Sequence, residues 1–192
     1  MMIRGSGNPA GTNDCDFAEL IRKIRSGDDK AFKEIFYLMQ PGIFRFIYRY
    51  INDSCIAEDL TQETFIKFWV IRNNLDETRS PKAYLYRIAR NLALNHITRQ
   101  QPKQSHSISR NDYLSLIMDP AEQYDKYFLM DDFQRAVNDL PERCKATFIL
   151  SRYEGCDYSE IAEILHVSLQ TVKNQMNKAI AVLRKRLASH LS

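Results

Sequence analysis

The chain has 192 residues, enough for one large or two small domains, and 44% of them are apolar. Only 6 glycines and 6 prolines occur, which favours helices joined by short loops. The net charge of +3 is too small to make the whole surface a nucleic-acid partner, so any such surface depends on local segregation of charge. No apolar run could cross a bilayer and no signal peptide is evident, so we expect a cytoplasmic protein without membrane insertion.

Charge is segregated along the chain. Residues 53–63 carry acids and no bases, residues 79–111 carry seven bases and no acids, and residues 119–142 are again mostly acidic. The four cysteines are scattered without the close pairing of a zinc or redox motif, and we interpret them as buried, reduced thiols. The acids do not cluster as a catalytic metal would require. The sequence therefore predicts no cofactor, no metal site and no catalytic residue.

The first helix is predicted to begin at Asp14 or Asp16, after a disordered segment 1–12, and to end near Arg25 before Gly27.

A second helix begins at a cap formed by Asp28 or Asp29. Pro41-Gly42 should kink or break this helix before an aromatic segment resumes it to about Ile51.

The third helix, capped by Asp53 or Ser54, has two distinct faces. Its core face consists of Ala57, Leu60, Thr61, Thr64, Phe65 and Phe68. The opposite face aligns Asp59, Gln62, Glu63 and Ile66 at positions i, i+3, i+4 and i+7. A solvated charged face explains the acids, whereas a protein-docking surface also explains an isoleucine among them. The pattern leaves both interpretations open.

A fourth helix is predicted after Ser80-Pro81, a cap followed by proline at the first helical position. Outside its core stripe it presents Tyr84, Tyr86, Arg87, Arg90, Asn91 and Asn95. Aromatic rings can stack on unpaired bases and arginines can hold a nucleic-acid backbone. The alternative is that the two tyrosines are ordinary half-buried helix residues.

A polar and basic linker follows, and the remaining helices form a second domain that ends in a helix-turn-helix pattern. The fold class is therefore all-α, with two small helical domains joined by a flexible linker. The predicted boundaries are 1–12 for the disordered N-terminus, 13–100 for the first domain, 101–120 for the linker and 121–192 for the second domain.

The last helix of this pattern is the candidate for reading DNA. Its polar side carries Ser168 as the cap and then Gln170, Thr171, Lys173, Asn174, Asn177 and Lys178. From Gln170 to the C-terminus no carboxylate side chain occurs. Two amphipathic helices could instead simply close a small bundle, but an acid-free face rich in donors favours DNA binding.

Three stretches in this order, AEDLTQETFIKFW, SPKAYLYRIARNLALNHI and LPERCKATFILSRYEGCDYSEIAEILHVSLQTVK, resemble a sigma factor of bacterial RNA polymerase of the extracytoplasmic-function (ECF) type. The resemblance covers nearly everything from Asp28 onward. It implies a specificity subunit without catalytic activity, which binds core polymerase, directs it to specific promoters and helps to melt the minus-ten element.

The resemblance also implies roles for individual residues. It assigns binding of the clamp coiled coil in the largest polymerase subunit to Asp59, Gln62, Glu63 and Ile66. It assigns minus-ten DNA, including capture of a flipped base, to Leu75, Arg79, Tyr84, Arg87, Arg90, Asn91 and Asn95. It assigns minus-thirty-five DNA to Ser168, Gln170, Thr171, Lys173, Asn174, Asn177 and Lys178.

Four positions depart from the family pattern. Tyr84 stands where members usually carry Trp, which reduces the stacking area. Lys173 and Lys178 stand where several members carry Arg, and lysine cannot form a bidentate fork to guanine. His166 occupies a turn position often held by Gly, where a left-handed backbone is strained.

The resemblance implies promoter DNA and core polymerase as partners, and a membrane-bound anti-sigma protein or another recruiting partner as candidate regulators. A stand-alone DNA-binding regulator is the main rival, but it needs a ligand pocket or receiver domain that the first half does not suggest. An enzyme acting on nucleic acid is a weaker rival, because the acids lack the spacing of a metal site.

Overall fold

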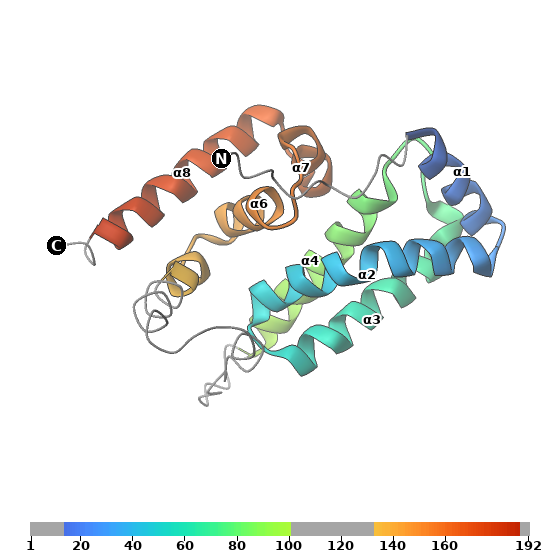
Figure 1. Ribbon diagram of the computed structural model, residues 1–192, viewed down its shortest axis with the longest axis horizontal. Coiled ribbons are helices and arrows are strands. Elements are labelled where there is room, and N and C mark those ends of the chain that lie inside the picture. The colour runs from blue at the N-terminus through green and yellow to red at the C-terminus, as the bar shows by residue number, and fades with distance from the viewer. Residues whose placement is uncertain (1–13, 101–132, 189–192) are drawn as a thin grey trace, which may run out of the picture.

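The computed structural model describes residues 14–100 and 133–188, and every regular element in these ranges is helical. Helices α1, α2, α3 and α4 form the first domain, and α6, α7 and α8 form most of the second (Figure 1). The predicted all-α, two-domain fold is therefore confirmed. The predicted disordered N-terminus and the linker lie outside the described residues.

Helix α1 (Asp14–Arg25) buries Ile21 and Ile24 completely. Gly27 ends the segment with a φ of 84°, a left-handed conformation that glycine adopts without steric cost.

Helix α2 (Asp29–Ile51) begins at the N-cap Asp28, whose carboxylate accepts hydrogen bonds from the backbone N–H groups of Lys30 and Ala31. The cap satisfies two donors that have no partner within the helix.

Of the kink or break predicted at Pro41, the break does not occur, because α2 is one helix of 23 residues. An interior proline costs a helix about 3 kcal/mol. Burial offsets this cost, since Ile35 before the proline and Ile43, Phe46 and Ile47 after it are fully buried. Each buried side chain of this size contributes about 1.5–3 kcal/mol.

Helix α3 (Ser54–Val70) starts at the N-cap Asp53 and has the core face that the sequence predicts. The six predicted core residues are the six buried ones. Thr61 and Thr64 are buried because their hydroxyls donate to the carbonyls of Ala57 and Leu60, at 2.6 and 2.7 Å. A short 3-10 turn, η1 (Arg72–Asn74), then leads through a loop to α4 (Pro81–Gln100), which packs against both α2 and α3.

The second domain is built around α6 (Glu142–Arg152), whose residues 144–150 are all buried. Helix α7 (Tyr158–Leu165) begins with a capping box. The side chain of Asp157 accepts a hydrogen bond from the backbone N–H of Glu160, and the side chain of Glu160 accepts one from the backbone N–H of Asp157. Helix α8 (Leu169–Ala188) packs on α6 and α7 through Val172 and Met176, and Figure 1 shows it at the outer edge of this domain. No described helix is long and apolar enough to span a membrane.

Candidate polymerase-binding and nucleic-acid surfaces

The strip on α3 faces away from the core, as predicted. Asp59, Gln62 and Ile66 are exposed, and Glu63 is half-buried and pairs with Lys67 at 2.9 Å. Ile66 is 62% exposed, although isoleucine is usually buried. The structure thus brings the four predicted residues together on the outward surface of one helix.

Sequence reasoning missed one member of this surface. Val70 lies one helical turn beyond Ile66 and is 67% exposed. Its spacing of four residues from Ile66, which places both on one face of the helix, could have identified Val70 from the sequence. The strip therefore begins with acidic and amide side chains and ends in an apolar pair, a composition suited to binding another protein.

The loop between η1 and α4 is fixed on several sides. The side chain of Leu75 is buried, and Glu77 pairs with Arg25 of α1 at 2.8 Å. The hydroxyl of Tyr84 accepts a hydrogen bond from the backbone N–H of Asp76 at 3.0 Å. These contacts join the loop to α1 and to the start of α4.

The predicted exposure of Tyr84 and Tyr86 is wrong, because these rings are 7% and 3% exposed. Tyr84 is buried because its hydroxyl reaches the loop, and the Arg87 guanidinium lies 4.8 Å from its ring centre. Tyr86 packs edge-on against Phe46 of α2, with ring centres 5.3 Å apart. Contact between Tyr84 and a DNA base stays a prediction.

The polar residues of α4 form a row along the helix. Arg87, Asn91 and Asn95 follow one another at i+4 spacing, and both asparagines are exposed. Arg79 lies just before the helix, where its Nε is 3.7 Å from Asp76. Another cation of α4, Arg90, is half-buried against the second domain.

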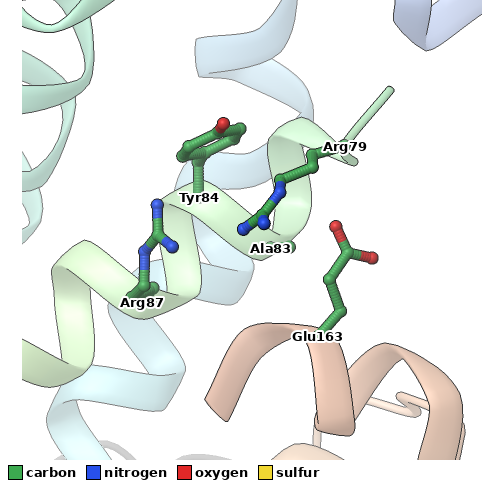
Figure 2. Close-up of a pocket in the computed structure, with 5 residues that line it drawn as sticks. All are labelled: Arg79, Ala83, Tyr84, Arg87 and Glu163. Carbon is green, nitrogen blue, oxygen red and sulfur yellow. The ribbon is translucent and has the colours of Figure 1, made fainter. Parts of the chain in front are cut away.

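Figure 2 shows how Arg79, Ala83, Tyr84 and Arg87 line a small pocket at this end of α4. Glu163 of α7 completes the pocket and points toward the α4 residues. Positive and negative side chains from the two domains therefore meet at the predicted minus-ten surface.

The polar side of α8 is open to solvent. Gln170, Lys173, Asn174, Asn177 and Lys178 are exposed, and Thr171 is half-buried. The Oγ of Ser168 accepts a hydrogen bond from the backbone N–H of Thr171 at 3.1 Å, so the predicted N-cap is confirmed. The side chains of this face are therefore accessible to a binding partner.

His166 has the left-handed backbone that its position implies, with φ 52° and ψ 48°. Its ring contacts the guanidinium of Arg87. Desolvation, followed by the positive charge of Arg87, lowers the pKa of the imidazole. The imidazole is thereby biased toward its neutral form beside a cation.

The cysteines are not uniformly buried. Cys144 and Cys156 are buried, as predicted, whereas Cys55 at the start of α3 is exposed. Cys15 lies among the residues whose side chains are not described.

Family models match both halves of the chain. Sigma-70 region 2 matches residues 35–103 and Sigma-70 region 4 matches residues 130–183, which together are more than half of the sequence. The first match contains α3 and α4, and the second contains α6, α7 and most of α8.

Curated relatives match over nearly the full length. The ECF RNA polymerase sigma factor SigW of Bacillus subtilis is 27% identical over 176 residues, which are 87% of this chain and 94% of the relative. The RNA polymerase sigma-H factor of Pseudomonas aeruginosa is 28% identical over 178 residues, covering 88% and 92% of the two chains.

Solved structures share the fold. CnrH in complex with the cytosolic domain of CnrY has a TM-score of 0.70 at 17% identity, over 90% of this chain and 97% of that one. The sigma factor RpoE in complex with the anti-sigma factor NepR from Bartonella quintana has a TM-score of 0.63 at 24% identity, over 83% and 98%. With both sigma-70 regions matched in order, the chain belongs to the sigma-70 family and is an ECF-type RNA polymerase sigma factor.

Proposed function

We propose that this protein binds core RNA polymerase through α3, directs it to promoters through α8 and α4, and helps to melt the minus-ten element. The observation that carries this function is the separation of three surfaces on one chain. An acidic strip with an apolar end lies on α3, a row of arginine and asparagine side chains lies on α4, and an acid-free polar face lies on α8.

The α3 strip, Asp59, Gln62, Glu63 and Ile66, is the surface for the clamp coiled coil, and Val70 extends it. Because Ile66 and Val70 are both more than half exposed, covering them removes apolar area from water. The adjacent acids orient the partner by charge complementarity.

The minus-ten surface is formed by Arg79, Arg87, Arg90, Asn91 and Asn95, with Leu75 and Tyr84 in supporting positions. Arginines hold the phosphate backbone, and exposed asparagines pair with base edges. Tyr84 positions the loop through its bond to Asp76, and its buried ring has to become accessible before it can stack on a base. Each captured base contributes about 1–3 kcal/mol of stacking, against a few kcal/mol for unstacking, so several contacts are needed.

The minus-thirty-five surface is the exposed side of α8, with Ser168, Gln170, Thr171, Lys173, Asn174, Asn177 and Lys178. No step in this function requires catalysis by the chain itself. CnrH and RpoE are solved in complex with CnrY and with the anti-sigma factor NepR, and on this basis we propose an anti-sigma protein as a further partner here.

Transcription by bare core polymerase on a promoter library tests the function. Addition of the protein should create a defined set of start sites that core alone does not use. A stand-alone regulator would bind duplex DNA equally well without polymerase and leave the start sites of core unchanged, and that result would contradict the proposal.

A further inference from the structure

The second domain contacts the helix that we propose reads the minus-ten element. Helix α4 packs against α2 and α3 of its own domain and also against α7 of the second domain, and α6 contacts α2. The elements that meet here lie far apart in the sequence. Their contact therefore shows that the two domains are closed on one another.

Two basic side chains of α4 are held by carboxylates of the second domain. Nε and Nη2 of Arg90 donate to the same oxygen of Glu142, at 2.9 and 2.6 Å. Nζ of Lys82 donates to Glu160 at 2.7 Å. A carboxylate oxygen that accepts from arginine or lysine resembles a phosphate oxygen in charge and geometry. Glu142 and Glu160 thus present to Arg90 and Lys82 the kind of acceptor that a DNA backbone offers.

A third contact covers Arg87, at the start of the polar row of α4. Arg87 touches the ring of His166, and Glu163 faces Arg79 and Arg87 across the pocket of Figure 2. The Oε1 atom of Glu163 is buried and has no hydrogen-bond partner among the described residues. An acceptor in this position is complementary to cations and repels an incoming phosphate.

A buried carboxylate anchors the other end of the interface. The side chain of Glu154 is 1% exposed and accepts hydrogen bonds from the hydroxyl of Tyr86 at 3.1 Å and from Arg45 at 3.3 Å. Gly42 permits this approach, since a Cβ there would lie 2.8 Å from the Tyr86 hydroxyl oxygen. The second domain consequently covers Tyr86 as well as the cations.

This arrangement is incompatible with simultaneous reading of both promoter elements. The minus-ten and minus-thirty-five elements lie more than two helical turns of about 10 base pairs apart, so their centres are separated by at least roughly 70 Å. In the structure α7, the first helix of the helix-turn-helix, touches α4 directly.

We propose that the closed arrangement is an autoinhibited state, in which carboxylates of the second domain compete with promoter DNA for the cations of α4. The inference rests on the proposed function of α4. It adds that the free protein masks its own minus-ten surface while leaving the strip on α3 and the polar face of α8 accessible. Binding to polymerase or to upstream duplex can therefore precede exposure of α4.

The test compares three full-length proteins: wild type, the double variant Glu142→Gln/Glu160→Gln, and the control Glu19→Gln/Glu34→Gln. Glutamine at 160 preserves an acceptor for the capping box. The control also loses two negative charges, from the exposed residue Glu34 of α2 and from Glu19, which is exposed and pairs with Lys23 within α1. Small-angle X-ray scattering measures the radius of gyration, amide hydrogen exchange follows α4 and α7, and fluorescence anisotropy measures binding of a labelled single-stranded 15-mer of dT.

We expect wild type and control to be compact, with α4 and α7 protected together. The double variant should expand, exchange faster in both helices and bind the 15-mer roughly tenfold more tightly, because two ion pairs that oppose binding are removed. An expanded wild type, or a double variant that binds no better than the control, would overturn the proposal. Pull-down of core polymerase is measured in parallel, and its failure in all three proteins would contradict the proposed function without bearing on the closed contact.

Discussion

Lys145 of α6 places its ammonium group against the end of α2, where Nζ donates to the backbone carbonyl of Tyr50 at 3.2 Å and lies 5.0 Å from the centre of that ring. The carbonyls at a helix C-terminus carry partial negative charge and attract cations. The lysine is only 7% exposed, however, and burial of a charged group is costly. This contact therefore both joins the two domains and limits the strength of their association.

The interface should strengthen as the pH rises above about 8. Desolvation lowers the pKa of Lys145 from 10.5 to about 8, against smaller opposing effects of Asp139 and Glu142. At a pH between these two pKa values, an exposed lysine keeps its proton whereas the buried lysine has lost it. Separation of the two domains therefore takes up a proton, and it becomes less favourable as the pH rises. The difference between the two pKa values of Lys145 corresponds to a free energy of about 3 kcal/mol.

The variant Lys145→Met keeps the apolar stem and removes this titration. Its stability relative to wild type, measured by urea unfolding, should be highest near pH 7 and should shrink toward pH 9.5. A stability difference that does not vary with pH would contradict the burial of a charged lysine at this site.

Reversal of charge on α3 should abolish association with core polymerase. Asp59→Arg combined with Gln62→Ala places a cation on the acidic strip and removes an amide beside it, while both positions are exposed and leave the core intact. We expect binding in a pull-down to fall by at least about tenfold, as for central residues of an interface. Glu34→Arg, an exposed charge reversal on α2, is the control and should bind normally; equal binding by both variants would remove the docking assignment.

Two lysines of α8 should set the salt dependence of duplex binding. Replacing Lys173 and Lys178 by Ala should weaken the affinity for upstream duplex and reduce the slope of log K against log salt by about 0.9 for each phosphate that is no longer neutralised. Lys30→Ala with Lys33→Ala removes two exposed charges from α2 and provides the matched control. If the α8 variant kept the slope of the control, α8 would not be the reading helix.

Features with local causes were predictable from the sequence. The N-caps at Asp28, Asp53 and Asp157 depend on residues two or three positions away, and the buried face of α3 follows from helical spacing. The exposed strip of α3 and the open face of α8 follow from the same periodicity.

Features with distant causes were not predictable. Helix α2 continues through Pro41 because packing of the surrounding apolar residues outweighs a local preference. Tyr86 is buried because its hydroxyl donates a hydrogen bond to Glu154, 68 residues away. Arg90 donates a hydrogen bond to Glu142, 52 residues away. No spacing rule links such positions. The polar residues of α4 could therefore be found from the sequence, whereas their contacts with the second domain could not.

The left-handed turn at His166 gives a prediction about stability. A residue with a Cβ in this conformation costs roughly 1–2 kcal/mol relative to the right-handed helix, whereas glycine adopts it freely. His166→Gly should therefore raise the free energy of unfolding by about 1 kcal/mol, because the exposed contact with Arg87 that it removes contributes little.

Gly155 provides the opposite test in the same domain. Its φ is 65° and an added Cβ would meet nothing within 4 Å, so Gly155→Ala introduces backbone strain without a steric clash. We expect this variant to lower the free energy of unfolding by about 1 kcal/mol. Urea unfolding of both variants at one pH separates the two causes: if His166→Gly were destabilised as much as Gly155→Ala, the contact of His166 with Arg87 would outweigh the strain at this turn.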